Sequence, residues 1–171
     1  MYDYARDTRS EEKMLEDFKI GKHNETVCLA NLANELVWKN PEVFEVSYLQ
    51  NELDEPGQFK TYQPDAVFTI TMQDERVFML NVEVKCTGFK LKDPLFIKAG
   101  QVRWLQSHKN PYFLIADVER YLFIAVDKLL LKTGSAQPIK EKGNKEFYLL
   151  PHKLGLFSHW TYGANLKRPT F

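Results

Sequence analysis

The segment PDAVFTITMQDERVFMLNVEVK, residues 64–85, contains two alternating apolar runs, AVFTITM and VFMLNVEV, separated by the polar residues QDER. This pattern predicts a β-hairpin with one buried face. Directly opposed residues of an antiparallel pair share a face. Most apolar residues of the two runs stand at even-numbered positions: Ala66, Phe68, Ile70 and Met72 in the first, and Phe78, Leu80, Val82 and Val84 in the second. Pairing Asp65 with Glu83 centres the turn on Asp74 and keeps that apolar face intact. Asp65, Glu83 and Lys85 are then expected together on the opposite face.

Two carboxylates and one ammonium on one face suggest a particular chemistry. Paired carboxylates hold hard divalent cations, and an ammonium can orient an attacking water or stabilise an oxyanion. The acid-x-Lys spacing also occurs at 11–13 and 17–19, on an expected exposed helix, but only Glu83-Val84-Lys85 ends an apolar strand. Charges there are costly unless they are compensated. A phosphodiester-cleaving site is therefore predicted, with a purely structural salt-bridge cluster as the alternative.

The pairing of Pro64-Asp65 with a later Glu83-x-Lys85 resembles the PD-(D/E)xK nuclease superfamily, the fold of many restriction enzymes, Holliday-junction resolvases and RecB-like nucleases. The resemblance covers about residues 20–126. It implies an α/β, restriction-endonuclease-like fold of three layers, in which helices flank a central mixed β-sheet. Its short motif implies fold and chemistry more than substrate.

The resemblance also implies roles for particular residues. Asp65, Glu83 and the carbonyl of Val84 would bind Mg²⁺ or Mn²⁺, and Lys85 would act on the attacking water. Glu25, in a segment expected to open a helix, would reach the metal or a metal-bound water.

Two of these assignments have structural alternatives. An acid at a helix start is also favoured by the helix dipole, which is the alternative for Glu25. Gln101 shares a helix face with Lys98 and would hold the nucleophile or a phosphate, although glutamine is also an ordinary exposed helix residue.

Hydrophobic periodicity predicts the remaining elements. Helices are expected over 10–20, from an N-cap at Asn24 onward, and over 97–108. A strand is expected over 43–49, with Phe44, Val46 and Tyr48 in the core, followed by a loop at 51–64. Further strands are expected on either side of a turn at 117–120 and near 128–132 and 146–150. This order predicts a mixed sheet covered by helices.

Length and composition indicate one domain over residues 1–171. The resemblance implies a core at about 20–126 and leaves 127–171 as a C-terminal extension. There are 171 residues, 44% of them hydrophobic, and neither a linker nor a repeat. The longest apolar run, YLFIAV, is too short to cross a membrane, and no signal peptide is expected. Cys28 and Cys86 are expected to be free thiols in a reducing compartment. A cytoplasmic protein is therefore predicted, in the host cell if a phage encodes it.

Charge is balanced overall but segregated along the chain. The whole sequence has 23 basic and 23 acidic residues, yet 41–84 holds nine acids against two bases and 128–171 holds eight bases against two acids. Segregated charge is typical of a polyanion-binding protein, and also of an ordinary solvated surface. The expected DNA-binding residues are Lys90, Lys92, Lys98, Arg103 and Lys109.

The predicted function is a Mg²⁺- or Mn²⁺-dependent DNA endonuclease of phage or bacterial recombination, repair or DNA degradation. Lysine contacts the backbone without reading bases, so selection by DNA structure is expected. No nucleotide-binding motif is present. Because symmetric cutting requires two sites related by a two-fold axis, a homodimer is expected. A DNA exonuclease and a catalytically silent nucleic-acid-binding module of this fold remain as alternatives.

Overall fold

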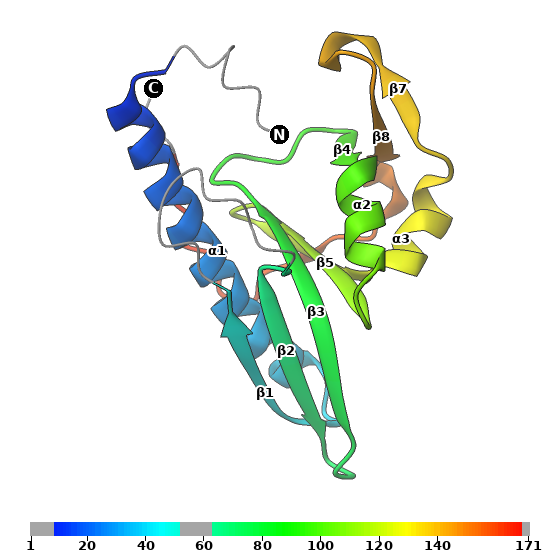
Figure 1. Cartoon of the computed structure of the whole chain (residues 1–171). Helices are drawn as coiled ribbons and strands as arrows, with labels where there is room; N and C mark the ends of the chain where they lie inside the picture. The colour runs from blue at the N-terminus through cyan, green and yellow to red at the C-terminus, as the bar shows by residue number, and fades with distance from the viewer. Residues whose placement is uncertain (1–8, 52–62, 169–171) are drawn as a thin grey trace.

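The computed structural model describes residues 9–51 and 63–168, so most of the loop expected at 51–64 lies outside the described residues. A six-stranded sheet forms the centre of the molecule, in the order β1-β2-β3-β5-β6-β9 (Figure 1). Its strands are β1 Val43–Gln50, β2 Ala66–Met72, β3 Val77–Cys86, β5 Pro111–Ala116, β6 Arg120–Ala125 and β9 Ser158–His159. Only β3 and β5 run parallel, so the sheet is mixed.

Helices cover both faces of this sheet. Helix α1, Glu11–Lys39, packs on one face through a core that includes Leu29, Leu32 and Phe68. The other face carries the helices α2 Ala99–Gln106 and α3 Val126–Thr133. A second sheet, ordered β4-β8-β7, lies beside these helices and consists of β4 Leu95–Lys98, β8 Lys145–Leu150 and β7 Gln137–Ile139. The expected three-layer α/β architecture is confirmed.

The hairpin that the sequence predicts forms in the predicted register. Ala66 opposes Val82 and Ile70 opposes Phe78. The residue numbers of each of these pairs add up to the same total as those of Asp65 and Glu83, which is the predicted register. Asp74 lies in the turn between the strands, and Glu75 follows it with a φ of 68°. Alternation along β2 and β3 therefore places the charged residues on the face opposite the α1 core.

The two helices expected before residue 40 are one continuous helix. Ser10 caps α1 by accepting a hydrogen bond from the Lys13 N–H (3.2 Å). Gly21 lies inside the helix, where it costs only about 1 kcal/mol relative to alanine. The prediction of Asn24 as an N-cap is wrong, because its side chain is buried and binds the backbone of Lys167.

Three further expectations need correction. Phe44 is 63% exposed because a bulge between Val43 and Glu45 turns it away from the core. The expected strand at 128–132 is instead α3, since Val126, Leu129 and Leu130 lie at helical spacing and pack inward. The helix expected over 97–108 is shorter, because its first two residues belong to β4. The strands expected around 117–120 and near 146–150 are confirmed.

Asp117 organises the turn between β5 and β6 and is completely buried. Its Oδ2 accepts from the Leu91 N–H (3.1 Å), and its Oδ1 accepts from the N–H groups of Glu119 (2.9 Å) and Arg120 (2.8 Å). Burial alone raises the pKa of this carboxyl, but the backbone hydrogen bonds outweigh it and hold the pKa below its ordinary value. Asp117 thereby fixes Leu91 in the loop after β3.

Replacing Asp117 with asparagine is expected to lower the free energy of unfolding by about 3 kcal/mol at pH 7, since an amide cannot accept from all three N–H groups. A depressed pKa stabilises the fold above the ordinary value of about 4, and this contribution is lost as the pH falls through the folded-state pKa. The deficit of Asp117→Asn should therefore shrink below about pH 4. Urea denaturation at several pH values measures it, and a deficit that is absent at pH 7 would contradict the assignment.

No helix of the described ranges 9–51 and 63–168 is long and apolar enough to cross a membrane.

Candidate active site

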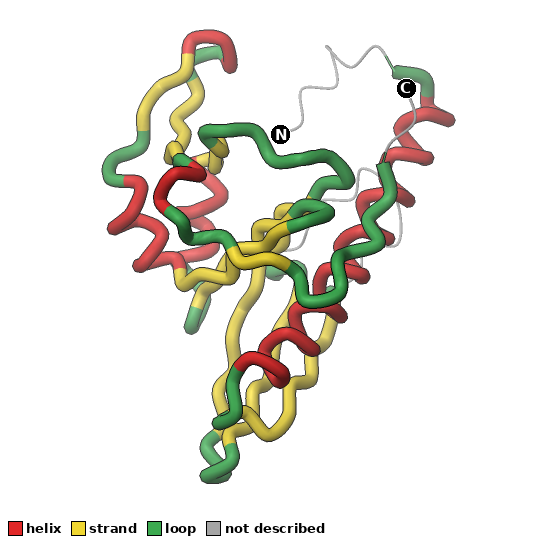
Figure 2. Tube along the Cα trace, turned by 180° about the vertical axis from the view of Figure 1, so that it is seen from behind, coloured by secondary structure: helices red, strands yellow, loops and turns green. Residues whose placement is uncertain are grey.

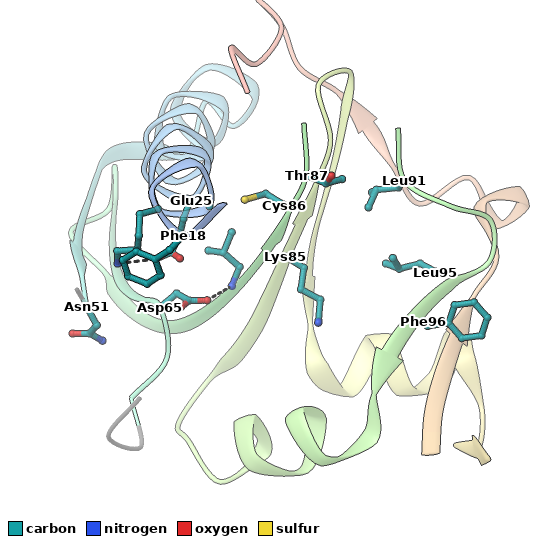
Figure 3. A pocket seen from close by; sticks show the side chains of 13 residues that line it. Phe18, Glu25, Asn51, Asp65, Lys85, Cys86, Thr87, Leu91, Leu95 and Phe96 are labelled. Carbon is teal, nitrogen blue, oxygen red and sulfur yellow. Dashed lines mark hydrogen bonds and ion pairs between the residues drawn. The ribbon is translucent and has the colours of Figure 1, made fainter. Parts of the chain in front are cut away.

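A cavity of about 500 Å³ opens between α1, the end of β3 and the segment that leads into β4 (Figure 3). It gathers four of the residues proposed for catalysis or metal binding, namely Glu25, Asp65, Val84 and Lys85. Its other lining residues are Phe18, Gly21, Lys22, Asn51, Cys86, Thr87, Leu91, Leu95 and Phe96. Three segments that are distant in the sequence therefore form one site.

Asp65 lies immediately before β2 and is only 2% exposed. Its Oδ2 accepts a hydrogen bond from the Val84 N–H (2.7 Å), so the first half of the motif is bound to the centre of the second. The carbonyl of Asp65 accepts from the Asn51 N–H (2.7 Å). Both the backbone and the side chain of Asp65 are thus held in place.

Glu83 lies across from Asp65 and is 4% exposed. Its Oε1 accepts a hydrogen bond from Gln101 Nε2 on α2 (2.7 Å). Gln101 does not line the cavity. Gln101 therefore contacts Glu83, the expected metal ligand, and this geometry suits a role in positioning Glu83 rather than the expected contact with nucleophile or phosphate.

Lys85 and Cys86 extend in opposite directions from β3, as successive strand residues do. Cys86 points toward α1, whereas Lys85 lies on the side of the cavity that faces Leu95 and Phe96 (Figure 3). Cys28, on α1, is a buried free thiol. A hydrogen bond with Cys86, together with burial, raises the pKa of Cys28 above its ordinary value, so this thiol stays protonated.

Glu25 enters the cavity from the middle of α1. Its Oε1 accepts from Gln50 Nε2 (3.1 Å) and lies 3.9 Å from the ammonium of Lys22. Because α1 begins at Glu11, Glu25 is far from the helix N-terminus. The helix-dipole explanation for this acid therefore no longer applies.

The donor set suits a small hard cation. Among the residues that the structure describes, no three His, Cys, Asp or Glu side chains lie close enough to hold one metal ion together. Magnesium commonly takes one or two carboxylates and completes its shell with water and substrate phosphates. Asp65, Glu83 and the Val84 carbonyl fit that requirement, and the structure does not join Glu25 to them in one ligand group.

Three of the expected DNA-binding residues lie near the cavity. Lys90 and Lys92 are exposed on either side of Leu91, which lines the cavity. Lys98 is exposed at the start of α2, two residues beyond the lining residue Phe96.

The other two lie elsewhere. Arg103 pairs with Glu146 (3.4 Å) on the exposed side of α2. Lys109 stands in the turn before β5, where its carbonyl accepts from the side chain of Asn81 (2.6 Å).

Several site residues carried no sequence signal. Gln50 ends β1 and Asn51 directly follows it, and Phe18 looks like any apolar residue of an amphipathic helix. Their roles depend on α1 packing beside the hairpin, which is a tertiary contact that no short motif encodes.

Truncating Gln101 to alanine should lower the cleavage rate by about tenfold to a hundredfold. Removing a residue that hydrogen-bonds to a metal ligand typically reduces activity or metal affinity by that factor. The loss should come with a higher Mg²⁺ requirement and unchanged DNA affinity, measured by titrating Mg²⁺ at saturating DNA. Gln106→Ala, at the exposed end of the same helix, is the matched control. Equal Mg²⁺ dependence in Gln101→Ala and the unmodified protein would exclude the positioning role.

No family model and no curated protein matches the chain. Among solved structures, it is similar to Hjc, a Holliday junction resolvase from Archaeoglobus fulgidus, with 19% identity and a TM-score of 0.44 over 81% of this chain and 93% of that one. It is also similar to the restriction endonuclease MspI in complex with its cognate DNA, with 12% identity and a TM-score of 0.25 over 47% of this chain and 30% of that one. In the order of its elements, and in the placement of Pro64-Asp65 and Glu83-x-Lys85 on the central hairpin, the chain resembles the PD-(D/E)xK, restriction-endonuclease-like nucleases.

Proposed function

We propose that this protein is a metal-dependent DNA nuclease that hydrolyses phosphodiester bonds. The observation that carries the proposal is the cavity in which Glu25, Asp65 and Lys85, from three separate segments, face a common space. Asp65, which lines the cavity, and Glu83, which does not, are both almost fully buried. Buried carboxylates are costly to keep in a fold unless a cation or hydrogen bonds compensate them.

Each residue has a distinct task in this proposal. Asp65 and Glu83, with the Val84 carbonyl, would hold Mg²⁺ or Mn²⁺, which supplies Lewis-acid activation of the phosphate when bound. The Val84 N–H fixes the orientation of Asp65. Lys85 would orient the attacking water and stabilise the negative charge that develops on the phosphate oxygens. Glu25 would hold a further water at the opposite wall of the cavity.

The finer proposal is an endonuclease that selects DNA by its structure, in recombination, repair or DNA degradation. Lys90 and Lys92 beside the cavity are point charges suited to backbone phosphates, and neither offers the bidentate fork with which arginine reads guanine. Cutting both strands of a symmetric junction would need a second copy of the chain, so we include a homodimer in the proposal.

A panel of labelled DNAs tests this proposal: linear duplex, single-stranded circle, supercoiled circle and four-way junction, each with Mg²⁺. We expect cuts confined to branch points or single-stranded regions, including cleavage of circles that have no ends. Cleavage of linear DNA alone, proceeding from its ends, would favour the exonuclease alternative. Cuts at one recurring sequence of a long duplex would contradict structure selection. Binding without cleavage of any substrate would favour the silent module.

A further inference from the structure

The C-terminal segment 160–168 returns to the candidate active site by running along α1, as the rear view shows (Figure 2). Its first part is firmly anchored. Trp160 is buried and donates from Nε1 to the carbonyl of Asp117 (2.9 Å). The next residue, Thr161, donates to the buried carboxylate of Glu35 from its N–H (2.6 Å) and its hydroxyl (3.0 Å).

Glu35 is charged in this arrangement. Burial raises the pKa of its carboxyl, but hydrogen bonds from Lys39 and Thr161 outweigh that effect and lower it. Lys39 Nζ lies 2.7 Å from the carboxylate. The segment is therefore fastened to α1 by charge-assisted hydrogen bonds, which are stronger than neutral ones.

The far end of the segment is held by the side chain of Asn24. Asn24 Nδ2 donates to the Lys167 carbonyl (2.9 Å), and the Lys167 N–H donates to Asn24 Oδ1 (2.7 Å). One amide side chain thus satisfies both backbone groups of Lys167. Asn24 directly precedes Glu25, so Lys167 is fixed one residue away from a wall of the cavity.

The opposite edge of the segment rests on Gly88. A Cβ at Gly88 would lie 2.2 Å from the Lys167 carbonyl oxygen and 2.9 Å from the Arg168 nitrogen, so only glycine allows this approach. Arg168 Nε donates to the Gly88 carbonyl (3.1 Å), and its guanidinium carbon lies 5.8 Å from the centre of the Phe89 ring. Gly88 directly follows Thr87, another lining residue of the cavity.

Segment 160–168 is thus held between Asn24 on one side and Gly88 on the other, which fixes the position of Arg168. We propose that Arg168 binds a backbone phosphate of the DNA beside the cavity. This inference rests on the proposed nuclease function. Arg168 is exposed, and among the residues that the structure describes no carboxylate is paired with it. A guanidinium that is held by one N–H and stacked on a ring keeps its terminal N–H groups for a bidentate contact with phosphate.

The chain offers a control arginine with a similar ring contact. Arg76, at the turn between β2 and β3, also lies 5.8 Å from a phenylalanine ring, that of Phe78, and is exposed. It differs from Arg168 in that its Nε is paired with Asp74 (2.7 Å). It is far along the hairpin from Asp65, which stands at the other end of β2. Substitution of Arg76 removes the same charge without touching the cavity.

The test is the affinity for a fluorescent four-way junction, measured by anisotropy with EDTA present so that no strand is cut. In Arg168→Ala we expect Kd to rise roughly tenfold and the slope of log Kd against log salt to fall by about 1, the loss of one phosphate contact. Arg168→Lys should recover the slope and part of the affinity. Arg76→Ala should leave both unchanged.

Variants that displace segment 160–168 but keep Arg168 test whether the position of Arg168 matters in addition to its charge. Gly88→Ala should raise Kd about as much as Arg168→Ala, and the double variant should be no worse than either one. Asn24→Ala, which removes both hydrogen bonds to Lys167, provides a second displacement, and thermal unfolding verifies that each variant folds. Additive losses of DNA affinity in the double variants would contradict the proposal that Asn24 and Gly88 act by positioning Arg168.

A wrong role for Arg168 and a wrong overall function would give different results. If the unmodified protein binds and cuts DNA while Arg168→Ala keeps its affinity and salt slope, the inference about Arg168 is wrong and the proposed function stands. If the unmodified protein neither binds nor cuts any DNA, the proposed function fails and the inference fails with it.

Discussion

Cleavage by Asp65→Asn should fall at least about a thousandfold, which corresponds to about 4 kcal/mol of lost transition-state stabilisation. The substitution keeps the size of the side chain and an oxygen that can accept from the Val84 N–H. It removes the negative charge that, together with Glu83, would bind Mg²⁺. Because burying a charged carboxylate carries a larger desolvation cost than burying a neutral amide, asparagine at this buried position should leave stability unchanged or raise it. Activity and stability should therefore move independently, as expected for a functional carboxylate.

The control for this result is Asp74→Asn, at the exposed turn of the same hairpin. It removes the same charge, and we expect cleavage within twofold of the unmodified protein. Initial rates at saturating Mg²⁺ and DNA, together with thermal unfolding, give the comparison. Full activity in Asp65→Asn would remove this carboxylate from the site and leave the structural salt-bridge cluster as its explanation.

Replacing Lys85 with alanine should also reduce the rate of the chemical step by about a thousandfold, since it removes the cation that we propose orients the attacking water. Binding of Mg²⁺ and of DNA should change little, because Lys85 is not among the expected metal ligands. Lys85→Arg should recover only part of the rate, since a guanidinium is a poor proton acceptor. Single-turnover cleavage separates the chemical step from binding.

Lys19→Ala is the matched control for Lys85. Asp17-Phe18-Lys19 repeats the acid-x-Lys spacing on α1, where Lys19 is exposed and Asp17 is paired with Arg9 (2.6 Å). We expect no change in the single-turnover rate. A Lys85→Ala protein that cleaves as fast as Lys19→Ala would exclude a role for Lys85 in the chemistry.

The hairpin could be predicted because its register follows from one local rule. Even-numbered apolar residues on both strands permit only pairings that leave the motif acids together on the other face, and the observed pairs Ala66–Val82 and Ile70–Phe78 obey that rule. Its turn follows from the same register. The gathering of Asp65 and Lys85 at one cavity also depended on this short-range pattern.

The N-terminal helix could not be predicted correctly from local signals. Asn24 is a good N-cap residue by type, and Gly21 before it looks like a helix break. The deciding interaction is with Lys167, 143 residues away in sequence, and nothing near Asn24 indicates it. The same contact helps to hold the C-terminal segment 160–168 beside the cavity.

Local periodicity also failed where the sheet departs from regular geometry. The alternation around Phe44 predicts a buried side chain, but the bulge before Glu45 shifts the register and exposes it. In 126–133 the apolar residues are dense enough to fit a strand or a helix. Val126 and Leu129 pack with Val102 and Leu105 of α2 in the core on this side of the sheet, and this packing favours the helix.

The most direct test of the central claim is cleavage of a four-way junction and of supercoiled circular DNA by the unmodified protein, with Mg²⁺ and with EDTA, beside Asp65→Asn. We predict cleavage by the unmodified protein in Mg²⁺, none in EDTA, recovery when Mg²⁺ is returned in excess, and no cleavage by Asp65→Asn. Cleavage that persists in EDTA, or that Asp65→Asn carries out at the unmodified rate, would contradict a metal-dependent nuclease site built on Asp65, Glu83 and Lys85.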